Sequence, residues 1–189
     1  MIAYQKEKIE NAVCFFASKH KEYTGKNLYQ TSLFKYLALF EYEYLKKHGR
    51  PPLGLKYLAM EKGPVPIDIY KERDRYKTSC AYFKKVDENK YVVISTAKPD
   101  MDYFSPSEID EMVRLIKIYA DEFVRTKTMS EATHQEIKAW RETYRKNPNG
   151  EIDFKLTFEK DFEKKESKDL SVAEESFLIY KAIEKAGSH

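Results

Sequence analysis

The residues of this sequence most able to do chemistry are its histidines, its cysteines and one serine–histidine pair. Ser130 and His134 stand four positions apart, so on a helix they would face each other and could form two members of a nucleophilic triad. The sequence shows neither a candidate oxyanion hole nor a nucleophile-elbow motif to go with this pair. We therefore interpret His134 as a capping, supporting or partner-contacting residue and predict no catalytic residue and no enzyme.

Metal and cofactor sites are not predicted either. The histidines His20, His48, His134 and His189 are scattered and form no cluster with a cysteine. Sequence signatures of phosphate loops, dinucleotide folds and zinc proteases are missing. Cys14 and Cys80 stand among apolar residues outside any CxxC motif, which predicts reduced cysteines in a core. We expect neither a metal nor a cofactor.

Composition favours a globular cytoplasmic protein. Of the 189 residues, 42% are hydrophobic and 34% are charged, and no apolar run approaches the ~18 residues that span a bilayer. Lysine and glutamate interrupt the N-terminal segment, so it lacks the apolar stretch of a signal peptide. The 34 basic and 31 acidic residues are interleaved, which is typical of a solvated surface rather than a nucleic-acid-binding stripe.

Tyrosine is unusually frequent, with 15 Tyr and 11 Phe against one Trp. Because tyrosine joins an apolar ring to a hydroxyl, it suits contact surfaces as well as half-buried core positions. Two segments, 19–26 and 71–77, mix tyrosine with basic residues as single-strand nucleic-acid binders do. Glu22, Glu72 and Asp74 interrupt them, so a solvated face is the simpler interpretation.

Apolar spacing and capping residues predict the elements that would position these side chains. A first helix ends near His20, and a second, apolar over much of its circumference, opens at Thr31 or Ser32 and ends at Gly49. A short helix over 66–76 and capping boxes at Ser105, Thr128 and Ser171 predict four more helical stretches. The helix that opens at Ser105 should reach Val124.

Extended structure is expected in two places. Residues 80–96 form a β-hairpin around a polar turn at 87–90, which must lean on the helices or gain a third strand. Alternating apolar residues over 152–158 predict a strand or an extended arm, followed by an exposed linker over 159–169. The fold class is thus α+β and mostly α, with a small antiparallel sheet packed on a helical domain.

Several of these features together resemble the Panacea domain, a family of Soc-related antitoxins found in bacterial and prophage genomes. The resemblance rests on the amphipathic helix over 33–44, the turn at 49–51, the segment 57–60, the Gly63-Pro64-Val65 loop and the pair Thr133-His134 followed by Trp140. Thr133 replaces the serine that the family leads one to expect. The similarity spans residues 3–158, so we expect one domain over 1–158 and an appended linker and helix over 159–189.

The resemblance implies an antitoxin that binds and neutralises a cognate toxin, encoded beside it, by masking it or by delivering it to a protease system. Composition alone leaves two alternatives open: a phage-associated or regulatory protein-binding adaptor without a toxin, and a nucleic-acid-binding regulator. The expected partner-binding residues are Tyr57, Gly63, Pro64, Val65, Pro66, His134 and Trp140. The Gly-Pro-Val-Pro segment would act as a rigid surface loop or hold a turn between helices, and Trp140 would be a core anchor or a contact residue.

Overall fold

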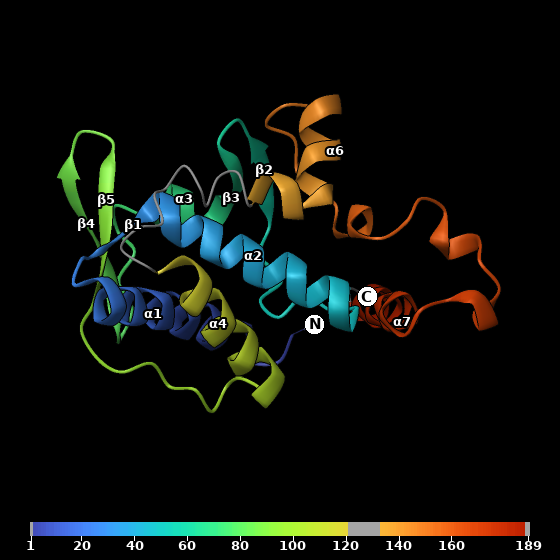
Figure 1. Cartoon of the computed structure of the whole chain (residues 1–189), viewed down its shortest axis with the longest axis horizontal. Coiled ribbons are helices and arrows are strands. Elements are labelled where there is room, and N and C mark those ends of the chain that lie inside the picture. The colour runs from blue at the N-terminus through green and yellow to red at the C-terminus, as the bar shows by residue number, and fades with distance from the viewer. Residues whose placement is uncertain (1, 121–132, 188–189) are drawn as a thin grey trace.

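Helix α2 (Gln30–His48) runs through the middle of the molecule (Figure 1). The computed structural model describes residues 2–120 and 133–187. Fourteen of the 19 residues of α2 are buried, because α1, α4, α7 and strands of both sheets pack against it. This confirms that the second helix is apolar around its circumference because it is central.

Helices α1 (Gln5–Thr24) and α4 (Pro106–Tyr119) lie together on one side of α2 (Figure 1). The ammonium of Lys8 on α1 bonds to the Glu108 carboxylate on α4 at 2.6 Å, and both side chains are buried. Glu108 also completes the predicted capping box, because the Ser105 N–H donates to it at 2.8 Å. One side chain thus starts α4 and fixes it to α1.

The expected hairpin is confirmed as β4 (Ala81–Asp87) and β5 (Lys90–Ser95), and it gains a third strand. The short β1 (Leu28–Tyr29) pairs antiparallel with β5, which gives the order β1-β5-β4. This sheet packs on α1 and α2. The α+β, mostly helical class is therefore confirmed for the described part of the chain.

A second, two-stranded sheet joins β2 (Tyr57–Met60) to β3 (Gly63–Pro66), and α3 (Ile67–Glu72) follows. The helix predicted over 66–76 is therefore shorter than expected. The helix ends at Glu72, and the chain then pairs with β4: the Phe83 N–H donates to the Tyr76 carbonyl, and Lys77 bridges to Tyr82.

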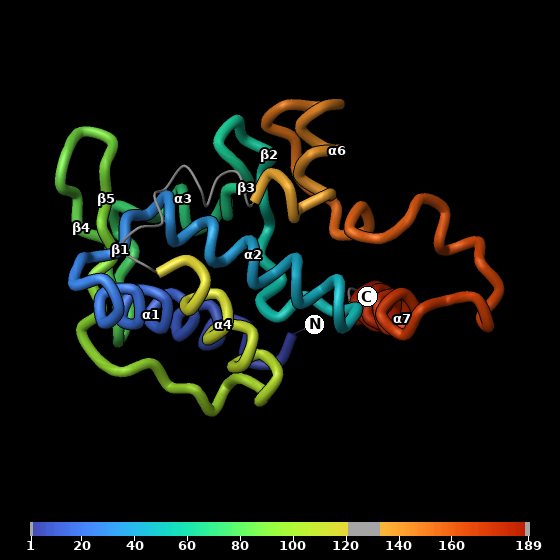
Figure 2. The backbone as a smooth tube through the Cα atoms, in the orientation of Figure 1, coloured from blue at the N-terminus to red at the C-terminus, as the bar shows by residue number. Residues whose placement is uncertain are grey.

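The C-terminal part contains α6 (Lys138–Lys146), three short 3-10 helices and α7 (Val172–Ala186). The 3-10 segments are η1 (Phe154–Thr157), η2 (Phe162–Lys164) and η3 (Ser167–Asp169). Figure 2 shows the chain running outward from α6 through these turns and returning to α7 beside the end of α2. Ser171 and Glu174 form the predicted capping box of α7.

The expected strand over 152–158 is wrong beyond Ile152. The Asp153 carboxylate accepts the Lys155 N–H at 2.9 Å and so starts η1 instead. The linker over 159–169 is also not fully exposed, because Phe162 is buried against Phe158 and Phe177, with ring centroids 5.1 and 6.0 Å away. Phe158 and Phe162 thus pack against Phe177 of α7.

Three helix ends differ from the prediction as well. Helix α1 continues to Thr24 because no breaker precedes Gly25, whose left-handed backbone ends it. Helix α2 begins at Gln30 without a side-chain cap, since the chain enters it directly from β1. The helix that opens at Ser105 ends at Tyr119, with Ala120 as its C-cap, so the predicted end at Val124 is wrong. The predicted capping box at Thr128 lies outside the described residues.

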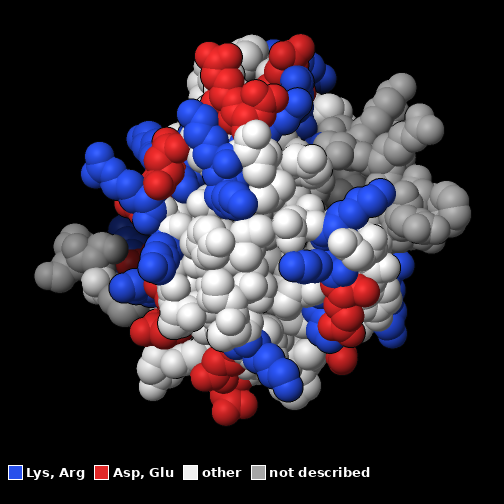
Figure 3. Space-filling model, turned by 90° about the vertical axis from the view of Figure 1, so that its left-hand side faces the viewer, with Lys and Arg blue, Asp and Glu red and all other residues white. Residues whose placement is uncertain are grey.

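The surface mixes both signs of charge, as expected. Figure 3 shows the end of the molecule beside β1, where an uncharged area is surrounded by basic and acidic side chains in alternation. Within the described residues, every helix is too short or too polar to cross a membrane.

A pair of glycines tests how α7 is attached. Gly25 and Gly49 both end helices with φ near 70°, but only Gly49 is crowded: a Cβ there would lie 2.1 Å from the Ala173 carbonyl oxygen of α7. We expect Gly25→Ala to lower the free energy of unfolding by about 1–2 kcal/mol through backbone strain. Gly49→Ala should lower it by a further ~1–3 kcal/mol through overpacking. Urea denaturation measures both, and equal losses would show that α7 does not depend on this contact.

Candidate partner-binding site

The site is built around a buried carboxylate, that of Glu41 in α2. Glu41 is fully buried, and its Oε1 accepts the backbone N–H groups of Leu53 at 3.1 Å and Gly54 at 2.7 Å. Its Oε2 accepts the N–H of Leu55 at 3.3 Å. Three successive N–H groups are thus satisfied by one side chain, which sets the path of the chain into β2.

Burial also changes the acidity of this carboxyl group. Desolvation raises the pKa of Glu41 from 4.5 to about 7, although the three N–H donors partly oppose the rise. Tyr57, the first residue of β2, is fully buried close by, and burial together with the Glu41 charge raises its pKa well above the ordinary value. The Glu41 carboxyl is therefore a weaker acid in the folded protein than in the unfolded chain.

The Gly63–Pro66 segment forms strand β3, not the surface loop that the sequence suggested. Tyr57 pairs with Pro66, and Met60 pairs with Gly63. Only Val65 of these four residues is half-buried, while the others are buried. Two prolines are compatible with a strand here because β3 is an edge strand, where missing N–H donors are tolerated.

An aromatic stack lies next to the turn of this hairpin. The rings of His134 and Trp140 are parallel with centroids 4.1 Å apart, and Tyr144 stacks on Trp140 at 5.3 Å. The Trp140 Nε1–H donates to the Met60 carbonyl at 3.0 Å. Gly63 has φ +120°, and a Cβ on it would stand 3.4 Å from the Thr133 hydroxyl. The glycine thus permits this close approach.

Residues 149–152 extend the small sheet along the free edge of β2. The Asn149 N–H donates to the Ala59 carbonyl, and the Ala59 N–H donates to the Gly150 carbonyl, both at 2.8 Å. The Ile152 N–H then donates to the Tyr57 carbonyl at 2.9 Å. The extended conformation predicted for Ile152 is therefore present at this point, and it joins α6 to the hairpin.

The structure brings the predicted site residues together around one hairpin. Gly63, His134 and Trp140 meet at its turn, whereas Tyr57 lies at the far end with its ring 5.6 Å from that of Tyr42. Val65 and His134 are half-buried, and the other members are buried. Ser130 lies outside the described residues, so its pairing with His134 has no structural account.

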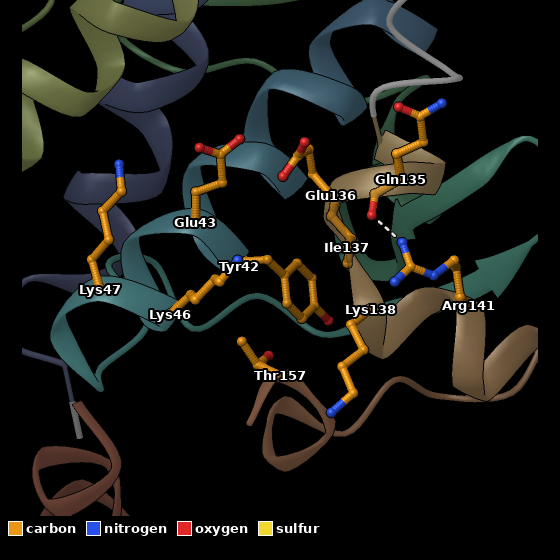
Figure 4. Close-up of a pocket in the computed structure, with 10 residues that line it drawn as sticks. All are labelled: Tyr42, Glu43, Lys46, Lys47, Gln135, Glu136, Ile137, Lys138, Arg141 and Thr157. Atoms are coloured by element: carbon orange, nitrogen blue, oxygen red, sulfur yellow. Dashed lines mark hydrogen bonds between the residues drawn. The ribbon is translucent and has the colours of Figure 1, made fainter. Parts of the chain in front are cut away.

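A surface pocket of about 450 Å³ lies between α2, α6 and η1 (Figure 4). Helix α2 forms one wall, residues 135–138 and Arg141 form the second, and η1 closes the floor. Its lining residues are Tyr42, Glu43, Lys46, Lys47, Gln135, Glu136, Ile137, Lys138, Arg141 and Thr157. Figure 4 shows the Tyr42 ring pointing into the pocket toward Lys138 and Thr157.

Most charges that line the pocket have partners. Glu43 pairs with Arg114 of α4, and Lys47 bonds to Glu111 at 2.8 Å. Burial raises the pKa of Glu43, and the Arg114 charge opposes the rise. The Lys138 ammonium donates to the Phe158 carbonyl at 2.6 Å. Lys46 forms no ion pair within the described residues.

Sequence reasoning did not identify Glu41 or this pocket. Glu41 carries a visible signal, since it is a carboxylate within the apolar run of α2, and such a residue is buried only when it is hydrogen-bonded. The pocket carries none, because Tyr42 and Thr157 are 115 positions apart and meet only through the unpredicted turn η1. Within the described residues, no three potential metal-ligating side chains gather. Cys14 and Cys80 are free and buried, as predicted.

Comparison with known proteins identifies one family. The sequence model described as antitoxin SocA-like, Panacea domain, matches residues 33–141. The comparisons with curated proteins and with solved structures found no match. The matched region begins inside α2 and ends in α6, so it contains Glu41, the β2–β3 hairpin and the His134–Trp140 stack.

The Glu41 pKa predicts a pH-dependent stability. A folded-state pKa raised from 4.5 to about 7 means that the stability associated with protonated Glu41 is complete below pH 4.5 and is lost as the pH rises through 7. Urea denaturation should show wild type losing up to about 3 kcal/mol relative to Glu41→Gln across this window. The difference isolates Glu41, because His20 and the other titrating groups occur in both proteins. A constant difference from pH 5 to 8 would contradict the assignment.

Trp140 is predicted to act as a structural anchor for the hairpin. It is 7% exposed and bonded to Met60, so Trp140→Ala should destabilise the fold by roughly 3–5 kcal/mol. Trp140→Phe, which retains a ring but loses the N–H donor, should cost about 1 kcal/mol. Thermal melts compare the two variants, and a loss under ~0.5 kcal/mol for alanine would show that Trp140 is not part of the core.

Proposed function

The chain belongs to the SocA-like antitoxins with a Panacea domain, and from this premise we propose that it neutralises a cognate toxin by binding it directly. The observation that carries the proposal is the family match over residues 33–141. An antitoxin of this kind is a non-catalytic protein, so its effect must come from a protein contact. The toxin is encoded beside it, and both act in the cytoplasm.

The proposed contact surface is the turn end of the β2–β3 hairpin with the adjoining helical residues. Val65 and His134 reach the surface there, and Tyr57, Gly63, Pro64, Pro66 and Trp140 hold them in place. Backbone pairing on both edges of β2, and the Trp140 bond to Met60, order this region before any partner arrives. A pre-ordered surface binds with a smaller entropic penalty, which favours a recognition role.

Two routes of neutralisation are compatible with direct binding. The chain masks the active surface of the toxin, or it holds the toxin for a protease system. A strain that lacks its cytoplasmic ATP-dependent protease separates these routes, since rescue by masking persists there and rescue by proteolysis does not.

Co-expression tests the proposal. The neighbouring gene, induced alone, should arrest growth, and this chain expressed with it should restore growth and co-purify with its product. A double variant, Val65→Ser with His134→Ala, should weaken the complex by about 30-fold or more if these residues are hot spots. Lys85→Ala on the distant β4 strand is the matched surface control. A harmless neighbour, or arrest that this chain cannot relieve, would refute the antitoxin proposal.

A further inference from the structure

Two hydroxyl groups in the wall of the α2–α6–η1 pocket are buried without a hydrogen-bond partner. Tyr42 is 3% exposed, and its hydroxyl has no partner within the described residues. The hydroxyl of Thr157, which lines the same pocket from η1, is likewise buried and has no partner within the described residues. Buried polar groups in folded proteins are nearly always bonded, and two of the unpartnered groups among the described residues belong to residues that line this one pocket.

The Tyr42 hydroxyl is held in its donor form. Burial raises its pKa well above the ordinary value, and the charges of Glu41, Asp153 and Glu151 raise it further. The ring itself is fixed by neighbouring aromatics, Tyr57 at 5.6 Å and Phe154 at 5.4 Å between centroids. A rigid hydroxyl that remains protonated is suited to donate to an oxygen acceptor.

Basic groups lie on the same side of the pocket as these hydroxyls. Lys46 from α2 and Lys138 from α6 both line it, and Figure 4 shows them flanking Tyr42 and Thr157. Glu43 and Glu136 line the opposite side. Arg114 offsets the Glu43 charge, and Glu136 is exposed to solvent, which screens it. The Lys46 and Lys138 ammonium groups oppose the Glu41, Asp153 and Glu151 charges that act on the Tyr42 hydroxyl. The side of the pocket next to Lys46 and Lys138 therefore offers positive charge to a ligand with oxygen acceptors.

We propose that this pocket receives an acidic side chain of the partner protein, whose carboxylate oxygens accept hydrogen bonds from Tyr42 and Thr157 beside the Lys46 ammonium. The inference rests on the proposed function, since it names the chemistry by which the toxin is held. A pocket of about 450 Å³ is large enough for one or two side chains. The two hydroxyls, which have no partner within the described residues, would each gain an acceptor in the complex.

The matched variants are Tyr42→Phe, Thr157→Val and Tyr91→Phe. Tyr91 is also buried, but its hydroxyl donates to Asp74, far from the pocket. Tyr42→Phe removes an unsatisfied group, so its melting temperature should equal or exceed that of wild type while toxin affinity falls at least tenfold. Thr157→Val should also weaken binding at least tenfold. Tyr91→Phe should melt lower and bind as wild type does.

A peptide titration tests the pocket without the toxin. N-acetyl-Asp-Glu-Asp-amide should shift the NMR signals of Tyr42 and Thr157 in the full chain at millimolar concentration. The isosteric N-acetyl-Asn-Gln-Asn-amide should not, and Tyr42→Phe with Thr157→Val should abolish the acidic-peptide shifts.

The outcomes of the two experiments are distinguishable. If wild type does not bind the neighbouring gene product, the proposed function fails, and the peptide titration alone decides the pocket. If wild type binds the toxin but both pocket variants bind equally well, the pocket inference is overturned and the antitoxin proposal stands. Equal shifts with the two peptides, or none with the acidic one, would also overturn it.

Discussion

The hydrogen bonds from three consecutive backbone N–H groups to the buried Glu41 carboxylate are the interaction on which the rest of the site depends. They fix residues 53–55 against the middle of α2, and β2 begins two residues later. The β2–β3 hairpin then receives residues 149–152 on one edge, and Trp140 bonds to its Met60 end. Because a buried carboxylate is unfavourable unless its bonds are complete, this loop cannot move without a large energetic cost. Helix α2 therefore fixes the positions of the hairpin, the aromatic stack and the pocket.

Helix α2 is also where the other parts of the molecule converge. The Lys8–Glu108 pair joins α1 to α4, and the ion pairs Arg114–Glu43 and Lys47–Glu111 join α4 to α2. At its C-terminal end, Gly49 allows the backbone of α7 to approach. The pocket opens on the remaining side, where α2 meets α6 and η1 (Figure 4). A partner bound there would contact a surface whose positions are determined by the core, which is the condition for binding without a large ordering penalty.

Local signals in the sequence predicted the elements that depend on local physics. The capping boxes at Ser105 and Ser171, the left-handed end at Gly49 and the β4–β5 hairpin are all present. Features that depend on long-range pairing were missed. The two prolines of Gly63–Pro66 favour a loop, but pairing with β2 makes this segment an edge strand. The alternating apolar residues of 154–157 form a 3-10 helix instead of a strand, because the Asp153 side chain caps its start. The predicted site residues do gather around one hairpin, yet most of them are buried. Sequence spacing gave no reason to place Tyr42 and Thr157 in one pocket.

The central claim is that the proposed toxin surface comprises the turn end of the β2–β3 hairpin and the adjoining α2–α6–η1 pocket, and that both depend on Glu41. Hydrogen–deuterium exchange of the free protein and of its complex with the neighbouring gene product tests this most directly. We expect added protection in residues 63–66, 133–146 and 154–158, with little change in the distant β4–β5 hairpin at 81–95. Protection confined to that hairpin or to α7, with residues 133–146 and 154–158 unchanged, would contradict it.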